Sequence, residues 1–360
     1  MRRSESRDIV DVSLLWAAVI MAALFVAGLR PRRFSAEPAV QSCPIREQER
    51  GRLSTTPLEI SARGWRDVLL RVFHNFSDHR IMDLAAGVTF YSLLALFPAI
   101  AALVAIYGLF ADPATLSANL DKMSGVLPAG AIQVIHDQLT RVVEQRSSTL
   151  GLTFIISLAV SLWSANAAMK SLFDTLNVVY AEREARGLVT LNAQSLAFTV
   201  GGIAFIIVAL GAVVVLPAVL GFLGLSGFTE LLLRLGRWPA LFVVLTLALA
   251  VIYRYGPSRN QAQWHWVTWG SAFAALAWLV LSILFSWYAE NFGNFNRTYG
   301  SLGAVIGFMT WIWLSAIVIL IGGELDAEME HQTACDTTIG PPKPLGARQA
   351  TMADTIGARQ

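Results

Sequence analysis

Long apolar runs constrain this chain more than any other feature of its sequence. They lie at about residues 84–110, 150–172, 194–223, 239–256, 265–289 and 301–322. A run of about 18 or more apolar residues predicts a helix that crosses the ~30 Å hydrocarbon layer of a bilayer, because only such a helix satisfies its own backbone hydrogen bonds in lipid. Charged residues are only 14% of the chain, against roughly a quarter in a soluble domain. The sequence therefore predicts an all-α, polytopic integral membrane protein with a six-helix core bundle.

A further apolar segment near the N-terminus is harder to assign. Residues 13–29 are apolar, but arginines flank both ends, so the basic residues do not set an orientation. Arginines directly behind the segment also oppose its translocation as a secretory signal. A membrane anchor, an interfacial segment and a start codon assigned too early all stay open.

These features divide the chain into four parts. Residues 1–29 form the N-terminal apolar segment, and 65–330 form the six-span membrane domain. The arginine-rich and proline-containing stretch 30–64 and the Pro, Gly, Thr and Ala-rich stretch 331–360 lack long apolar runs. Both are predicted to be disordered, the first as a basic linker and the second as a cytoplasmic tail.

Lysine and arginine are distributed unevenly between alternate connections of the six spans. One set of connections carries 18 of these residues and the other set carries six. The positive-inside rule assigns the richer set to the cytoplasm. We therefore expect a multi-pass protein of the bacterial inner membrane, with both ends of the six-span core in the cytoplasm.

Proline and glycine within the spans predict helix kinks and close helix packing. Pro98 and Pro217 each fall inside an apolar run, where proline removes a backbone hydrogen bond and kinks or breaks a helix. Gly303 and Gly307 are four residues apart, a spacing that lets two helix backbones approach. Small residues are also common in membrane helices, so either explanation of the glycines is open.

Polar residues within the spans are the candidates for function, since a charge in the bilayer is costly. Arg254 closes the fourth span, although a snorkelling arginine would look the same. Four carboxylates follow the sixth span at Glu324, Asp326, Glu328 and Glu330, and a solvated helix face is the plainer explanation of that run. The candidate substrate pathway consists of Tyr91, Pro98, Asn166, Lys170, Arg254 and Glu324.

Motifs of soluble enzyme chemistry are absent from the sequence. It contains no Walker loop, His-Glu-x-x-His, Gly-x-Ser-x-Gly or Cys-x-x-Cys motif. His74 and His79 with two nearby aspartates could be a metal cluster, but a basic helix beside the membrane explains them more simply. We expect no catalytic residue, no metal and no cofactor.

The expected partners follow from the same composition. A net charge of +2 without a concentrated basic face does not indicate a nucleic-acid partner. The bilayer and a small polar or anionic solute are the expected partners, and a homo-oligomer stays open.

Several short sequence blocks follow one another along the predicted spans. They are Leu84-Ala85-Ala86-Gly87 through Tyr91-Ser92-Leu93-Leu94 to Phe97-Pro98, Leu162-Trp163-Ser164-Ala165, Asn177-x-x-Tyr180, Tyr253-Arg254 with Pro257, Tyr299-Gly300-x-Leu302-Gly303-Ala304, and Gly322-Gly323-Glu324-Leu325. From about Trp65 to Glu330 the chain thus resembles the YihY/BrkB family of bacterial inner-membrane proteins, once labelled ribonuclease BN. The resemblance implies a six-span bundle with a cytoplasmic carboxyl end. The chain departs from the family at Asp326, where such proteins often have Asn, and residues 1–64 have no counterpart.

Three functions follow from these observations. The first is a transporter or exporter of a small anion or polar solute that works without ATP hydrolysis, supported by polar residues and broken helices within the spans. The second is an envelope-integrity or scaffold protein with no transported substrate. The third is a tRNA-processing nuclease, as the old family label implies, but its carboxylates and histidines would have to gather around metal ions, and here they are scattered.

Overall fold

Six long helices make up most of the part of the chain that the structure describes. This structure is a computed structural model, and it describes residues 50–110, 150–222, 227–292 and 303–360. The long helices are α4 (Ile81–Phe110), α7 (Leu150–Val179), α8 (Leu188–Phe222), α9 (Gly227–Tyr255), α10 (Trp264–Phe292) and α12 (Gly303–Gln332). Shorter elements are η1 (Pro57–Glu59), α3 (Ala62–Asp78) and α13 (Thr351–Asp354). The predicted all-α class is confirmed.

Each predicted span matches one long helix, apart from the end residues 223, 256, 301 and 302. Within the described residues, three helices are long and apolar enough to cross a membrane, over Leu188–Ile206, Trp264–Tyr288 and Val305–Gln332. Shorter apolar stretches lie at Ile81–Leu96 in α4 and Pro239–Tyr255 in α9. The chain is therefore a membrane protein with several apolar helices, and the number of six crossings stays a prediction. The apolar segment 13–29 lies outside the described residues.

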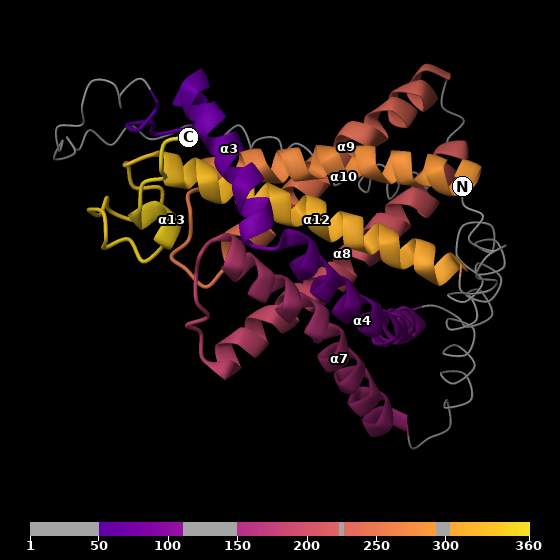
Figure 1. Cartoon of the computed structure of the whole chain (residues 1–360). Coiled ribbons are helices and arrows are strands. Elements are labelled where there is room, and N and C mark those ends of the chain that lie inside the picture. Colours follow the sequence, from indigo (N-terminus) through magenta and orange to yellow (C-terminus); the bar gives the residue numbers. More distant parts are fainter. Residues whose placement is uncertain (1–49, 111–149, 223–226, 293–302) are drawn as a thin grey trace, which may run out of the picture.

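The helix α12 lies at the centre of the bundle. It contacts α10, α4, α7 and α3, while α9 packs on α10 and α8 packs on α7. Figure 1 shows α12 running beside α10, with α4 and α7 diverging from it on the other side. Fully buried side chains of α7, α9 and α12, among them Leu176, Tyr253 and Leu320, form the core.

Glycines allow the backbones of α10 and α12 to touch. A Cβ atom added to Gly322 would lie 2.6 Å from the Cβ of Ala274, and one added to Gly270 would collide with the carbonyl oxygen of Gly322. Close approach of this kind stabilises helix pairs in lipid through van der Waals contact. A Cβ on Gly307 would meet nothing within 4 Å, so the close contact lies at Gly270 and Gly322 and not at the glycine predicted from spacing.

Prolines do not end the helices that contain them. Pro98 lies inside α4, and α8 continues past residue 217 to Phe222. The predicted break at Pro217 is wrong, since neighbouring turns keep their helical form around the lost hydrogen bond. Kinks at the two prolines stay a prediction.

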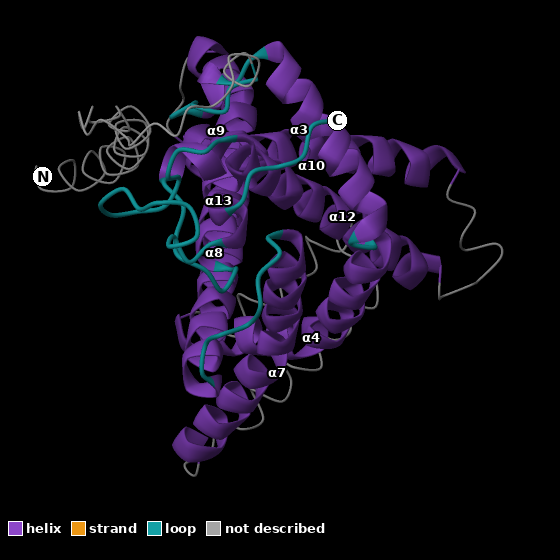
Figure 2. Cartoon of the chain, turned by 60° about the vertical axis from the view of Figure 1, so that its left-hand side comes forward, coloured by secondary structure: helices purple, strands orange, loops and turns teal. Residues whose placement is uncertain are grey.

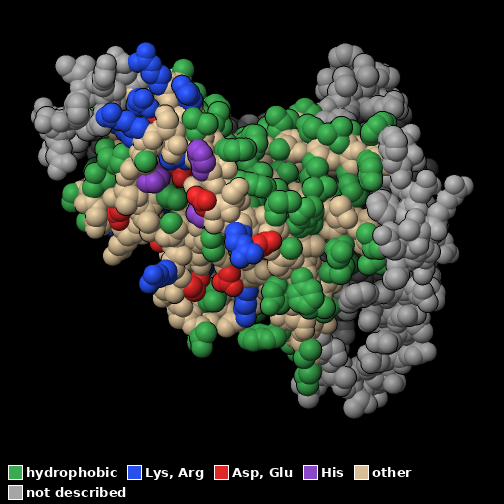
Figure 3. All heavy atoms as spheres, viewed as in Figure 1, with side chains coloured by type: hydrophobic (Ala, Val, Ile, Leu, Met, Phe, Trp, Pro, Cys, Tyr) green, Lys and Arg blue, Asp and Glu red, His purple; other side chains and the backbone are tan. Residues whose placement is uncertain are grey.

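Charged and apolar side chains are separated along the molecule. Figure 3 shows hydrophobic side chains over the helical body, whereas the charged side chains in view gather toward the end where α3 and α13 lie. The exposed apolar side chains include Val160, Trp163, Ile283 and Leu284 on α7 and α10. An apolar surface of this kind fits contact with lipid.

The charged end, here named the polar end, consists of α3, the loops 180–187 and 256–263, and residues 333–360. Its parts are joined by hydrogen bonds: the amide of Ala185 donates to Ser258 Oγ (3.0 Å), and that of Asn260 donates to the carbonyl of Gln349 (2.9 Å). Figure 2 shows the C-terminal segment as a loop that crosses the helix ends.

The predicted disorder of residues 331–360 does not agree with this structure. Arg348, only 3% exposed, donates to the carbonyl oxygens of Ala334 (2.7 Å), Cys335 (3.0 Å) and Ala353 (2.6 Å). One buried guanidinium can hold several carbonyls because it has five donors, so this segment folds without an apolar core of its own.

Part of the predicted disordered linker 30–64 is also ordered. Arg52 is buried and donates to the carbonyl oxygens of Gln332 (3.2 Å) and Gly357 (2.6 Å). Residues 50–64 therefore pack against the C-terminal segment, and residues 30–49 lie outside the described residues.

Candidate functional site

The last turns of α12 carry four carboxylates, and all four are buried. Glu324, Asp326, Glu328 and Glu330 are at most 2% exposed, so the predicted solvated face is wrong. Residues four apart lie on the same side of a helix. Glu324 and Glu328 therefore face α3, whereas Asp326 and Glu330 face α10 and the loop 256–263.

On the α3 side, the carboxylates bind side chains of an amphipathic helix. Arg71 Nε donates to Glu328 Oε2 (2.5 Å) and Asn75 Nδ2 donates to Glu328 Oε1 (2.8 Å). His79 Nδ1 is hydrogen-bonded to Glu324 Oε1. This hydrogen bond raises the pKa of His79 above its usual value. Within the described residues, no three His, Cys, Asp or Glu side chains are placed to hold a metal ion.

On the other side, the carboxylates join α12 to α10 and to the loop 256–263. Asp326 Oδ1 accepts a hydrogen bond from the amide of Gly270 (2.7 Å). Glu330 Oε1 accepts from Arg259 Nη2 (2.6 Å), and both of these side chains are fully buried. The Arg259 guanidinium also lies over the ring of Tyr180, 4.7 Å from its centroid.

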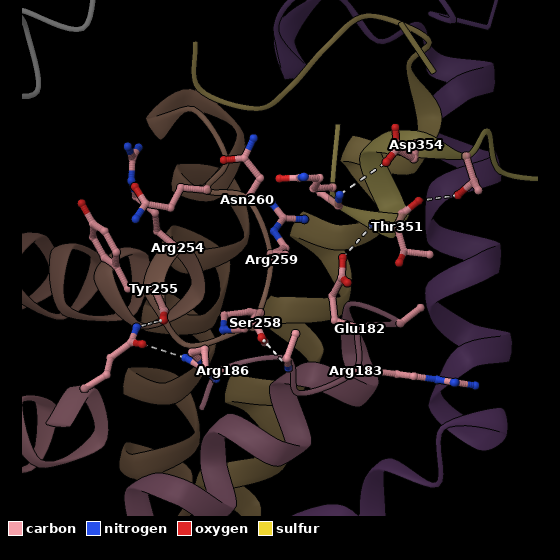
Figure 4. Close-up of a pocket in the computed structure, with 18 of the residues that line it drawn as sticks. Glu182, Arg183, Arg186, Arg254, Tyr255, Ser258, Arg259, Asn260, Thr351 and Asp354 are labelled. Carbon is pink, nitrogen blue, oxygen red and sulfur yellow. Dashed lines mark hydrogen bonds between the residues drawn. The ribbon is translucent and has the colours of Figure 1, made fainter. Parts of the chain in front are cut away.

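A cavity of about 1010 Å³ lies between residues 181–186, 254–261 and 346–355. Figure 4 shows its side chains, which come from the loop after α7, the end of α9 and the C-terminal segment. The charged residues of the lining are Glu182, Arg183, Arg186, Arg254, Arg259 and Asp354. Arginine is the cation in every case, so we name this space the arginine cavity.

Two members of the lining are already paired. Arg186 donates to both carboxylate oxygens of Glu184 (2.7 and 2.6 Å) and to Gln194 (3.0 Å). The hydrogen bond from Arg186 lowers the pKa of Glu184 to about 2. Glu182 accepts from the amide of Thr351 (2.6 Å), and burial raises the pKa of this carboxyl. These groups shape the cavity and have little capacity left for a ligand.

Arg254 and Arg259 are different, because part of each guanidinium is buried without a partner. Arg254 is 7% exposed and lies over the ring of Trp264, 4.3 Å from its centroid. Its Nε and Nη1 atoms, and the same two atoms of Arg259, have no hydrogen-bond partner among the described residues. An arginine stays protonated in proteins, and a buried donor left unbonded costs ~1–3 kcal/mol. Arg254 and Arg259 therefore add buried positive charge and unbonded donors to the wall of the arginine cavity.

The six residues predicted for a substrate pathway do not meet in one place. Of the six, Arg254 alone lines the arginine cavity. Asn166 is buried and accepts from Thr199 of α8 (3.3 Å), and Glu324 faces α3. Lys170 lies over the ring of Trp163, while Tyr91 is 44% exposed and Pro98 is partly buried in α4.

Sequence reasoning missed Arg186 and Arg259 as members of the site. Both lie in loops just after α7 and α9, which the charge distribution assigns to the same side of the membrane. That assignment was the available signal. Which arginines face one cavity depends on the three-dimensional packing of the loops.

Comparisons with known proteins agree with the resemblance seen in the sequence. The family model described as Virulence factor BrkB matches residues 72–345. A protein with a ribonuclease-like name, YfkH of Bacillus subtilis (strain 168), is 29% identical over 268 residues, which are 72% of this chain and 94% of the relative. The UPF0761 membrane protein NTHI0384 of Haemophilus influenzae is 20% identical over 276 residues, 73% of this chain and 94% of the relative.

Other relatives are longer than this chain. The UPF0761 membrane protein Mpe_A1422 of Methylibium petroleiphilum is 23% identical over 273 residues, and the match covers 73% of this chain but only 62% of that relative's length. No solved structure matches the chain.

Proposed function

Because the chain belongs to the family described as virulence factor BrkB, whose relatives here include UPF0761 membrane proteins, we propose that it is a transporter or exporter of a small anion or other polar solute. It works without ATP hydrolysis and is not an enzyme. It lies in the bacterial inner membrane with the polar end in the cytoplasm, as the distribution of Lys and Arg supports.

The buried, partly unpartnered guanidinium of Arg254 carries this proposal. Arg254 lies in the last turn of α9, at the junction between an apolar helix and the arginine cavity. A cation near the end of a helix is stabilised by the helix dipole, and a charged residue held at membrane depth indicates a path for ions or substrates. An anion that enters from the polar end therefore reaches Arg254 at the point where the apolar helices begin.

Flux into liposomes tests the proposal. The full chain is reconstituted and the uptake of inorganic anions and small polar solutes is compared with that of protein-free liposomes. We expect protein-dependent flux that falls at least tenfold in Arg254→Gln. The matched control is Arg183→Gln, because Arg183 lines the same cavity but its exposed side chain points away from Arg254 and Arg259 (Figure 4). Equal flux with and without protein across the whole panel would refute transport.

A scaffold role is the second candidate, and the dense bonding of the polar end favours it. Buried hydrogen bonds join α12 to α3 through Arg71, and to the loop 256–263 through Arg259, which would suit a rigid docking surface. In a strain that lacks the protein, Arg254→Gln would then restore envelope integrity in full, whereas Arg71→Gln would not. Protein-dependent flux together with failed rescue by Arg254→Gln would exclude this alternative.

A further inference from the structure

We propose that the arginine cavity binds a phosphate-type oxyanion at Arg254 and Arg259 and that it discriminates against halides. This inference rests on the proposed function, since it names the chemical class of the solute. It is carried by the four buried guanidinium nitrogens, two on each arginine, that have no hydrogen-bond partner among the described residues.

The aromatic contacts decide how these arginines can bind. Arg254 lies over Trp264 at 4.3 Å and over Tyr255 at 5.5 Å, and Arg259 lies over Tyr180 at 4.7 Å from the ring centroid. An aromatic ring covers the flat face of a guanidinium. The N–H groups at its edge then remain for a ligand, and oxyanions bind in this plane, as in arginine–carboxylate and arginine–phosphate pairs.

The neighbouring carboxylates do not compete for these donors. Glu330 takes one nitrogen of Arg259, Nη2, and leaves its Nε and Nη1 unbonded. Asp354 accepts from the amides of Gly346 (2.8 Å) and Arg348 (2.9 Å), and Glu182 from that of Thr351. Backbone amides therefore occupy Asp354 and Glu182, Arg259 Nη2 occupies Glu330, and the Arg254 charge is left for a ligand.

The composition and size of the cavity favour an oxyanion over a halide. Its cations are all arginines, and arginine recognises phosphate through several directed donors, whereas lysine acts as a compact point charge. A volume of about 1010 Å³ exceeds many times the roughly 30 Å³ that one water occupies in the liquid. A phosphate group with an attached organic or lipid part thus has room, and several oxygens can satisfy donors that point in different directions.

Binding to the purified full chain in detergent tests this. The thermal unfolding midpoint is measured with inorganic phosphate and with chloride at equal ionic strength. We expect phosphate, and not chloride, to raise the midpoint. Arg254→Gln should weaken phosphate binding roughly tenfold to a hundredfold. Arg254→Lys should weaken it as well, because it keeps the charge but loses the edge donors. Arg66→Gln, at an exposed arginine of α3 that does not line the cavity, should bind like the natural chain.

Equal effects of chloride and phosphate, or unchanged phosphate binding in both Arg254 variants, would overturn the proposal. If Arg254→Gln does not fold, equilibrium dialysis of labelled phosphate against the natural chain, with chloride as competitor, still tests whether the site prefers phosphate. Dioctanoyl phosphatidic acid and glycerol 3-phosphate then identify the source of the group. Tighter binding of the lipid supports a headgroup, and tighter binding of glycerol 3-phosphate supports a soluble phosphate ester.

These outcomes separate the ligand class from transport. Phosphate binding without flux in liposomes would refute the proposed function and leave the oxyanion site in place. Chloride flux without phosphate binding would refute the oxyanion site and leave transport in place.

Discussion

A buried donor without a partner lowers the stability of the fold that contains it, and Arg254 has two such nitrogens. Residues of this kind persist where function needs them. Arg254→Met keeps an unbranched apolar side chain against Trp264 and removes the unbonded charge. We expect this change to raise the free energy of unfolding by ~1–2 kcal/mol while abolishing the effect of phosphate.

Thermal unfolding of the purified protein checks this, with Arg183→Met as the control that should change little. A lower unfolding midpoint in Arg254→Met would show that the guanidinium stabilises the fold and does not destabilise it.

The His79–Glu324 hydrogen bond makes the stability of the polar end depend on pH. The pKa of His79 is raised chiefly by this hydrogen bond. The charges of Glu324, Glu328 and Asp78 raise it further, whereas burial lowers it. A group whose pKa is higher in the folded state contributes its full stability below the unfolded value of about 6.5. That contribution is lost as the pH rises through the folded pKa.

Unfolding midpoints measured between about pH 6 and pH 9 should therefore fall more steeply in the natural chain than in His79→Gln. Parallel curves for the two proteins would show that the His79 charge makes no net contribution.

At the scale of elements, the C-terminal segment forms one wall of the arginine cavity through Gly346, Gln349, Thr351 and Asp354. Arg348 holds this wall in place by its bonds to buried carbonyls. Arg348→Ala removes those bonds, so we expect residues 340–360 to become sensitive to limited proteolysis at least tenfold faster than in the natural chain. Lys343→Ala is the control, since Lys343 joins this network through its backbone amide and carbonyl.

Equal cleavage rates in the two variants would show that other contacts hold the segment, such as those of Arg52 with Gly357.

The elements differ in how far the sequence could predict them. Each apolar run matches one long helix to within two residues at its ends, because a span satisfies its own backbone hydrogen bonds, which is a local property. The burial of Glu328 and Glu330 depends on Arg71 and Arg259, which are 257 and 71 residues away in the sequence. The fold of residues 333–360 depends on Arg348 and on the distant Arg52. Composition therefore predicted disorder and a solvated face there. At the candidate site, only Arg254 could be found by its position at the end of a span.

The whole molecule is polarised, with its described charged loops gathered at one end. If the polar end is cytoplasmic, a cysteine placed at the exposed Arg183 should react with a membrane-impermeant thiol reagent in inverted vesicles and not in intact cells. Arg183→Cys is made in a background where Cys43 and Cys335 are serine. Labelling in spheroplasts with an intact membrane would reverse the proposed orientation.

The backbone contact between Gly270 and Gly322 limits how this bundle can move. No side chain separates α10 from α12 at this point, and the amide of Gly270 is bonded to Asp326. We therefore expect the two helices, with α9 packed on α10, to move as one rigid body. If α10 slid along α12, side chains next to the glycines would collide with the backbone of the other helix. An opening of the bundle would therefore move α4, α7 and α8 together relative to α12.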